Sequence, residues 1–433
     1  MNPSDLIRRL SQSKLLPEAL DDKARRTFTN DCLRQFFSGF SDTGPKTFFL
    51  LIAVRQFSAG DLYKTLISVP GSLGMTLSVL LLPLISGSAR KKTYWLAMAR
   101  VLTGICFLIA AAWPSLQAYV FWVLIGSLPS AIAYPLLTSV YNENYPRRMR
   151  GQLFAWASLV NMGSCAAASW IFGLWLGKHA EHYQGVLAVF GAANFLAAWS
   201  IARMPSPKQA GPSGRSFLHA FRWIRHDRTF AYMLGIWFIF GFGIFMMSPL
   251  KILYLTEARY GRVYSTATVA FIIGFLPEIF RMLTTPIWAR LFDRHHFVGI
   301  RMGINLILLA SMIAFFVGRT MPWLVTAAVL EGACTGGGNI AWALWVTHVA
   351  PAEHTTEYMS VNQFFTGIRG IAGTFAGIRL ASVVGLQEVA WFTIGLVLLS
   401  ILMMLPMRGD SRWIRTKLSS GPVAGLGREK AKA

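Results

Sequence analysis

Six charged side chains of this sequence lie deep inside long apolar stretches, where a charge is expensive unless it meets water or a partner. They are Asp42, Lys46, Glu278, Arg281, Glu331 and Arg369. An ionisable residue in such a place indicates a functional role by default, in binding a solute or in carrying a proton.

The spacing of four of these residues predicts two local ion pairs. Asp42 and Lys46 are four positions apart, and Glu278 and Arg281 are three apart, so on a helix each pair shares one face. A proton or a solute that breaks such a pair would shift the balance between two conformations. We therefore expect proton coupling at these four residues, with Asp42 as the first candidate for the proton carrier. A purely structural pair is the alternative.

Two further stretches place polar and aromatic groups in helical stripes. One runs through Glu331, Thr335, Gly338, Trp342 and Trp345, and the other through Asn362, Thr366, Arg369 and Gly373. Indole faces stack on sugar rings or apolar groups, and Arg and Asn side chains form directional hydrogen bonds. The stripes predict a site for a polar organic solute. The predicted substrate-binding residues are Glu331, Thr335, Trp342, Asn362 and Arg369. Trp345 fits an interfacial aromatic belt equally well.

These residues must be positioned by membrane-spanning helices. The chain has 433 residues, of which 54% are hydrophobic and 14% charged, with a mean hydropathy of +0.47. An apolar run of about 20 residues crosses a bilayer as a helix, because only a helix satisfies its own backbone hydrogen bonds there. The sequence thus predicts an all-α polytopic membrane protein with 12 transmembrane helices. The expected spans are 27–54, 62–87, 94–113, 117–141, 152–178, 184–203, 229–256, 264–290, 298–318, 322–349, 358–384 and 387–407.

The distribution of basic residues predicts the topology. An even number of spans puts both termini on one side, and 28 of the 41 Lys and Arg residues, Arg301 among them, fall on that side. Seven, including Lys251, fall on the other side. The positive-inside rule then places both termini in the cytoplasm, and we expect a bacterial inner (plasma) membrane protein. Because the +22 net charge is dispersed over short loops, nucleic-acid binding is not expected.

The longest break between spans divides the chain into two groups of six. It begins rich in Pro, Gly and Ser and continues as an amphipathic pattern, which indicates a flexible link and a helix on the membrane surface; a solvated loop is the alternative. The expected regions are a cytoplasmic N-terminal segment (1–26), a first six-helix bundle (27–203), a cytoplasmic linker (204–228), a second six-helix bundle (229–407) and a cytoplasmic tail (408–433).

The two bundles show signs of an internal duplication. Gly44-Pro45-Lys46 in the first falls near Ser248-Pro249-Leu250-Lys251 in the second, at an offset of 203 to 205 residues that also relates Pro83 to Pro286 and Pro146 to Pro351. Repeats of this kind are typical of transporters. We therefore expect the bundles to be pseudo-symmetric.

Two loops carry a resemblance to a known family. Ala289-Arg-Leu-Phe-Asp293-Arg294-His-His296-Phe297 resembles the loop signature of the major facilitator superfamily, although Ala289, His296 and Phe297 replace two Gly and a base. Tyr145-Pro146-Arg-Arg-Met-Arg150-Gly151 is similar to the aromatic-Pro-x-x-x-Arg-Gly that many members have between helices 4 and 5.

The resemblance covers about residues 27–407 and implies a central cavity lined by helices 1, 4, 7 and 10. It implies gating roles for Asp293 and Arg294, which would hold the inner gate shut; an ordinary basic loop is the alternative. Efflux antiporters of the family usually carry a Gly-Pro pair in helix 5, whereas residues 152–178 contain no proline. This difference disfavours drug efflux.

Together these features predict a secondary active transporter that moves a small polar organic solute by alternating access, with proton symport. A drug/proton efflux antiporter is the nearest alternative, and a membrane-embedded sensor or enzyme is the alternative from another class. No GxxxxGK(S/T) motif indicates ATP use, and the four cysteines form no CxxC pair. We expect a monomer without cofactor or metal, whose partners are the solute, protons and lipid.

Overall fold

The computed structural model describes residues 20–86, 88, 90–146, 148–206, 217–260, 262–318, 320–351 and 353–409. Most of the expected N-terminal segment, the middle of the linker and nearly all of the tail lie outside the described residues.

The first half of the chain folds into six membrane-length helical segments, two of which are interrupted. Their elements are α2 (Asp22–Thr43), the π-helix η1 (Gly44–Phe48), α3 (Phe49–Phe57), α4 (Asp61–Ser68), α5 (Pro70–Ser86), α6 (Lys92–Ala112), α7 (Leu116–Asn144), α8 (Arg150–Lys178), the 3₁₀ turn η2 (Ala180–His182) and α9 (Tyr183–Ala202).

The second half repeats this plan after two short linker helices. Its elements are α10 (Phe217–Ala220), α11 (Arg222–His226), α12 (Arg228–Thr256), η3 (Ala258–Tyr260), α13 (Thr266–Ala270), the π-helix η4 (Phe271–Phe275), α14 (Leu276–Arg294), α15 (Phe297–Val317), α16 (Met321–Val349), α17 (Thr355–Val383), α18 (Leu386–Met404) and η5 (Leu405–Gly409).

These helices coincide with all twelve expected spans, and no β-strand occurs in the described part of the chain. Eight described helices are long and apolar enough to cross a membrane, and a ninth span arises if α4 and α5, bent by 49°, count as one. The three other segments (22–57, 321–349 and 355–383) fall outside this set. They contain Lys46, Glu331 and Arg369, three of the candidate site residues.

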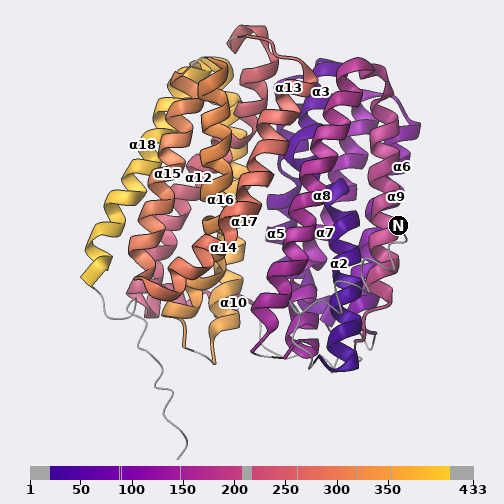
Figure 1. Cartoon of the computed structure of the whole chain (residues 1–433). Helices are drawn as coiled ribbons and strands as arrows, with labels where there is room; N and C mark the ends of the chain where they lie inside the picture. Colours follow the sequence, from indigo (N-terminus) through magenta and orange to yellow (C-terminus); the bar gives the residue numbers. More distant parts are fainter. Residues whose placement is uncertain are drawn as a thin grey trace, which may run out of the picture.

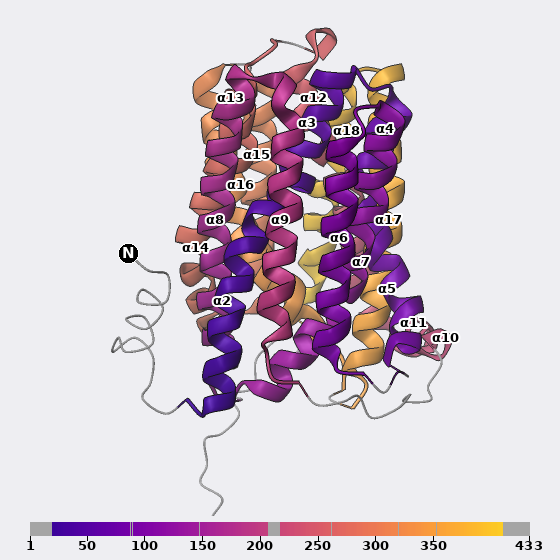
Figure 2. The same cartoon turned by 90° about the vertical axis from the view of Figure 1, so that its right-hand side faces the viewer.

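The helices form two bundles that lie side by side (Figures 1 and 2). In the first bundle α6 packs on α7 and α9, and α2 packs on α8 and α9. In the second, α12 packs on α17, α14 on α16, and α15 on α16 and α18. Between the bundles, α5 contacts α17, α8 contacts α13, η4 and α14, and α3 contacts α12. We call the end at which α2 begins and α18 ends the terminal end, and the other the far end.

The helix α17 packs closely between α12 and α5 because two of its contact positions are glycines. A Cβ on Gly377 would lie 2.4 Å from the carbonyl oxygen of Met246 in α12. A Cβ on Gly367 would lie 2.1 Å from the Thr76 hydroxyl in α5. Small residues at such contacts let membrane helices pack closely, so both positions require glycine.

The described end of the linker packs on α17. Instead of one amphipathic helix, the chain forms the short helices α10 and α11. The Phe221 ring lies 5.4 Å from the Phe364 ring, and the Trp223 indole N–H donates a hydrogen bond to Glu357 over 2.5 Å. These contacts hold the apolar side of the linker against protein at the terminal end.

Candidate transport site

An ion-paired triad at the middle of the molecule connects the two bundles. Lys46 Nζ in η1 lies 2.6 Å from Glu278 Oε1 in α14, and Arg281 Nη2 lies 2.7 Å from Glu278 Oε2. The side chains of Glu278 and Arg281 are 8% and 12% exposed, but that of Lys46 is 37% exposed. One buried carboxylate therefore serves two cations, and Lys46 borders space that solvent can reach.

The predicted Glu278–Arg281 pair is formed, whereas the expected Asp42–Lys46 pair is not. Asp42 instead accepts a hydrogen bond from the Asn161 amide at 3.0 Å. The π-helix η1 begins at Gly44, between the two residues. Lys46 turns to Glu278 of the other bundle, so a tertiary partner replaces the local one.

The π-helices η1 and η4 lie in contact, one from each bundle. A Cβ on Gly274 in η4 would lie 2.5 Å from the Ser169 hydroxyl and 3.1 Å from the Thr47 hydroxyl, so the segments approach closely. Single π-turns in helices occur frequently at functional sites. Here they flank the triad, since Lys46 belongs to η1 and Glu278 follows η4 by three residues.

A second buried pair joins α12 to α16. Lys251 Nζ lies 2.5 Å from Glu331 Oε1, and the Thr335 hydroxyl donates to the Glu331 carbonyl oxygen at 2.7 Å. Glu331 was expected in the site, whereas Lys251 was counted among the basic residues on the outer side. It is buried in α12, and the internal repeat was the signal that could have found it, because it is the counterpart of Lys46.

The stripe on α16 divides between accessible and buried positions. Glu331, Thr335 and Trp342 are half-buried, as expected of residues that contact a solute. Trp345 is fully buried and stacks on Phe230 and Trp237, with ring centroids 5.6 and 6.0 Å apart. Neither role considered for Trp345 fits this environment, because the indole packs inside the second bundle.

The predicted residues of α17 face the interior of the second bundle. Asn362 is completely buried and Arg369 is 4% exposed. The Arg369 guanidinium donates to the Trp237 carbonyl oxygen and, at 3.0 Å, to the Thr366 hydroxyl. Asn362 and Arg369 therefore lie inside the second bundle, with Arg369 bonded to α12, and neither joins the triad.

The sequence interpretation missed Arg301, which was counted with the terminal-end loops. It lies in α15, is 2% exposed, and places its guanidinium carbon 4.2 Å from the centre of the Trp237 ring and 4.5 Å from that of Phe240. Because Arg301 is four residues from the start of its helix, its side chain could have reached water. Instead it points inward and packs against Trp237 and Phe240 of α12.

A network of four charged residues joins the bundles at the far end. Lys64 at the start of α4 lies 2.6 Å from Glu257, which follows α12, and Arg259 lies 3.3 Å from Asp61. Arg259 also lies 2.5 Å from Glu257. Partial burial alone would lower the pKa of Arg259, but the hydrogen bond to Glu257 and its charge raise it above the ordinary value. These pairs link the two bundles at the far end.

The predicted gate residues lie at the terminal end. Asp293 and Arg294 are exposed in the last turn of α14. At the same end of the first bundle, Arg34 Nη2 lies 2.8 Å from Asp31 Oδ1, and the Tyr141 hydroxyl donates to the same oxygen at 2.8 Å. Arg34 lies near the terminal end, where a long side chain could extend toward the membrane surface. It is 3% exposed, because Asp31 neutralises it within the bundle.

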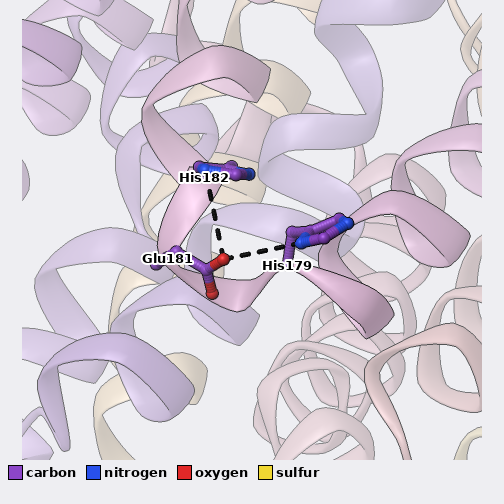
Figure 3. A group of neighbouring side chains, drawn as sticks. All are labelled: His179, Glu181 and His182. Atoms are coloured by element: carbon purple, nitrogen blue, oxygen red, sulfur yellow. Dashed lines mark ion pairs between the residues drawn. The ribbon is translucent and has the colours of Figure 1, made fainter.

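A separate cluster lies on the turn between α8 and α9, where His179 and His182 flank Glu181 (Figure 3). The nearest nitrogens of the two imidazoles lie 3.5 and 4.0 Å from Glu181 Oε1, and all three residues are exposed. The spacing could accommodate a divalent cation, but a carboxylate between two imidazoles accounts equally for the arrangement. The cluster is distant in sequence from every residue of the triad.

Comparisons with known proteins agree with this architecture. The sequence model of the Major Facilitator Superfamily matches residues 32–374 and 263–424. The nucleoside transporter NupG superposes with a TM-score of 0.69 at 14% identity, covering 90% of this chain and 100% of that chain. The D-xylose-proton symporter gives 0.64 at 13% identity (89% and 98% covered), and a bacterial homologue of the human lysosomal transporter Spinster gives 0.65 at 14% (92% and 98%).

No curated protein sequence matches the chain significantly. At these identities the solved structures establish the shared fold alone, whereas the family match spans most of the sequence. A transporter architecture is therefore established, with apolar helices that place it in a membrane. The chain belongs to the Major Facilitator Superfamily.

Proposed function

We propose that this protein is a proton-coupled secondary transporter that moves a small polar organic solute by alternating access. The observation that carries the proposal is the Lys46–Glu278 ion pair, because it joins the two bundles that must move relative to each other. Solved structures with the same fold include a nucleoside transporter and a D-xylose-proton symporter, both of which move polar organic solutes. We place both termini in the cytoplasm of a bacterial cell and propose that one chain suffices, since each bundle contributes to the triad.

The arrangement of charges supports an inward-facing state. Lys64, Glu257, Asp61 and Arg259 join the bundles at the far end, which is the outside in the proposed topology. Lys46 remains accessible at mid-depth. In the outward-facing state the far-end pairs would separate, and Asp293 and Arg294 would help to close the inner end.

Proton coupling would proceed through Glu278. Protonation of its carboxylate removes the charge that holds Lys46 and Arg281, and so releases the link between the bundles. Asp42 precedes Lys46 on the same span and is held by an uncharged amide, so it can receive the Lys46 ammonium when the bundles separate. Lys46 would thus exchange Glu278 in one state for Asp42 in the other.

The solute would bind beside this triad on the accessible face of α16. Glu331, held by Lys251, offers a carboxylate to hydroxyl and amino groups, Thr335 contributes a hydroxyl, and Trp342 contributes an aromatic face. Arg369 and Asn362 would act from the bundle interior.

Uptake into proteoliposomes tests the coupling. With a radiolabelled nucleoside and D-xylose as first probes, the wild-type protein should accumulate solute when the outside is made acidic. Glu278→Gln and Asp42→Asn should abolish this accumulation and preserve solute exchange at equal pH. Glu388→Gln, at an exposed position of α18, is the control and should behave as wild type. Proton-driven accumulation by both mutants would show that these carboxylates are structural.

A further inference from the structure

Two buried arginines of the second bundle have no carboxylate partner among the described residues. Arg301 in α15 is 2% exposed and Arg369 in α17 is 4% exposed. The other deeply buried cations of the spans, Arg34, Lys64 and Lys251, each lie within 3.4 Å of an acid. Buried charges in proteins are generally paired, so the two guanidinium groups call for an anion.

Both guanidinium groups lie at the side chain of Trp237. Their central carbons are 4.2 Å (Arg301) and 6.0 Å (Arg369) from the centre of its ring. Contact with aromatic faces offsets part of the cost of burying Arg301. It satisfies no N–H group, however, and adds no negative charge.

Several donors in this region have no acceptor. The Nε atoms of both arginines are buried without a hydrogen-bond partner, and Arg301 makes no hydrogen bond to any described residue. Asn362, two turns from Arg369 on the same face of α17, is completely buried with its amide nitrogen unpaired. An unpaired buried donor destabilises the folded state, so a ligand that accepts from these groups would stabilise the protein.

Open space beside Gly338 borders Arg301. A Cβ placed on Gly338 of α16 would meet a single atom within 4 Å, Arg301 Nη1 at 3.8 Å. At the neighbouring Gly337 the same test finds Ile304 at 2.7 Å, so the free space is specific to the Gly338 side. Gly338 shares its face of α16 with Thr335 and Trp342, which connects this space to the proposed solute-facing stripe.

We propose that Arg301 and Arg369 form a binding site for one small anionic group, located beside Gly338 and Trp237. A carboxylate suits the site, because a guanidinium binds it through two parallel N–H···O bonds. The carboxylate of a transported solute and an inorganic anion such as chloride present the same chemistry. Only a solute carboxylate as the ligand rests on the proposed transport function.

Thermal unfolding of the purified full-length protein tests the site. In a chloride-free sulfonate buffer, we would titrate sodium chloride, sodium lactate and, as the neutral analogue, lactamide. Anion binding to the folded state raises the unfolding temperature with concentration, and lactamide should have no effect. Arg301→Gln and Arg369→Gln should each weaken the response at least tenfold in concentration, whereas Arg379→Gln, at an exposed position of α17, should not.

A second variant guards against misfolding of the arginine mutants. Gly338→Leu keeps both charges but fills the space beside Arg301, so it should also weaken anion stabilisation. A response to chloride but not lactate identifies an inorganic anion, and the reverse identifies a carboxylate solute. Equal responses in wild type, Gly338→Leu and both arginine variants, or an equal response to lactamide, would refute the site. Anion binding without any solute uptake would leave the site standing and contradict the transport proposal.

Discussion

The triad predicts an unequal effect of removing its two linked partners. In Glu278→Gln, Lys46 and Arg281 both lose their only carboxylate within ion-pair distance among the described residues, at 2.6 and 2.7 Å. In Lys46→Gln, by contrast, Glu278 keeps Arg281. The first mutation should therefore destabilise the protein much more than the second.

The magnitude follows from the distances and the exposure. At 2.6 Å and an effective dielectric constant of 20, the Lys46–Glu278 attraction is about 6 kcal/mol, most of which offsets desolvation. Breaking a buried pair costs about 3–5 kcal/mol. Because the Lys46 side chain is 37% exposed, we take the lower value, about 3 kcal/mol, for Glu278→Gln, and about 1 kcal/mol, typical of a screened pair, for Lys46→Gln.

The assay is thermal unfolding in detergent at fixed protein concentration, with Glu388→Gln as the exposed control. The double mutant Lys46→Gln/Glu278→Gln should be more stable than Glu278→Gln alone, because it buries one uncompensated cation fewer. Equal losses for the two single mutants, or a double mutant less stable than Glu278→Gln, would refute a carboxylate shared by two cations.

Three further outcomes are expected. Glu331→Gln should raise the KM for the solute at least tenfold, measured by initial uptake rates, because it removes an acceptor from the accessible face of α16 and leaves a buried ammonium unpaired. Glu257→Lys should break the far-end network and increase labelling of Cys165 by an impermeant maleimide from outside severalfold, in a background without the other three cysteines; adding Lys64→Glu should reverse the effect. Asp293→Asn should change the transport rate more than protein abundance, measured by uptake normalised to immunoblot, since it weakens the inward-closed state.

Each of these has an outcome that contradicts it. An unchanged KM in Glu331→Gln would place the solute elsewhere, and the exposed Glu388→Gln serves again as control. Labelling of Cys165 that does not respond to Glu257→Lys would mean that the far-end pairs do not control access. If Asp293→Asn transports with wild-type kinetics at normal expression, Asp293 has no gating role and belongs to an ordinary basic loop.

Much of the fold could be predicted because the membrane restricts it so strongly. Only helices of about 20 apolar residues satisfy their backbone in lipid, so long apolar runs separated by short basic segments indicated the helical spans. The Glu278–Arg281 pair was readable as well, since it depends on local spacing.

The helical spacing of Asp42 and Lys46 did not predict their partners, at a point where the helix is irregular. Asp42 and Lys46 should share a face of an α-helix, but on either side of the π-turn start at Gly44 they bind other partners, Asn161 and Glu278 respectively. The sequence offered Gly44-Pro45 as a sign of irregularity, without specifying which irregularity would form.

The partners of the buried charges were decided by tertiary structure. Lys46 meets Glu278 from 232 positions away, and Lys251 meets Glu331 from 80 away. From their positions near helix ends, Lys251 and Arg301 were expected at the membrane surface. A long side chain at such a position can extend either toward water or into the bundle, and the sequence does not show which. Only the packing of α12 against α15, α16 and α17 determines that choice. The sequence alone thus predicted which residues form the membrane-length helices, whereas contact between distant helices determined which buried charges are paired.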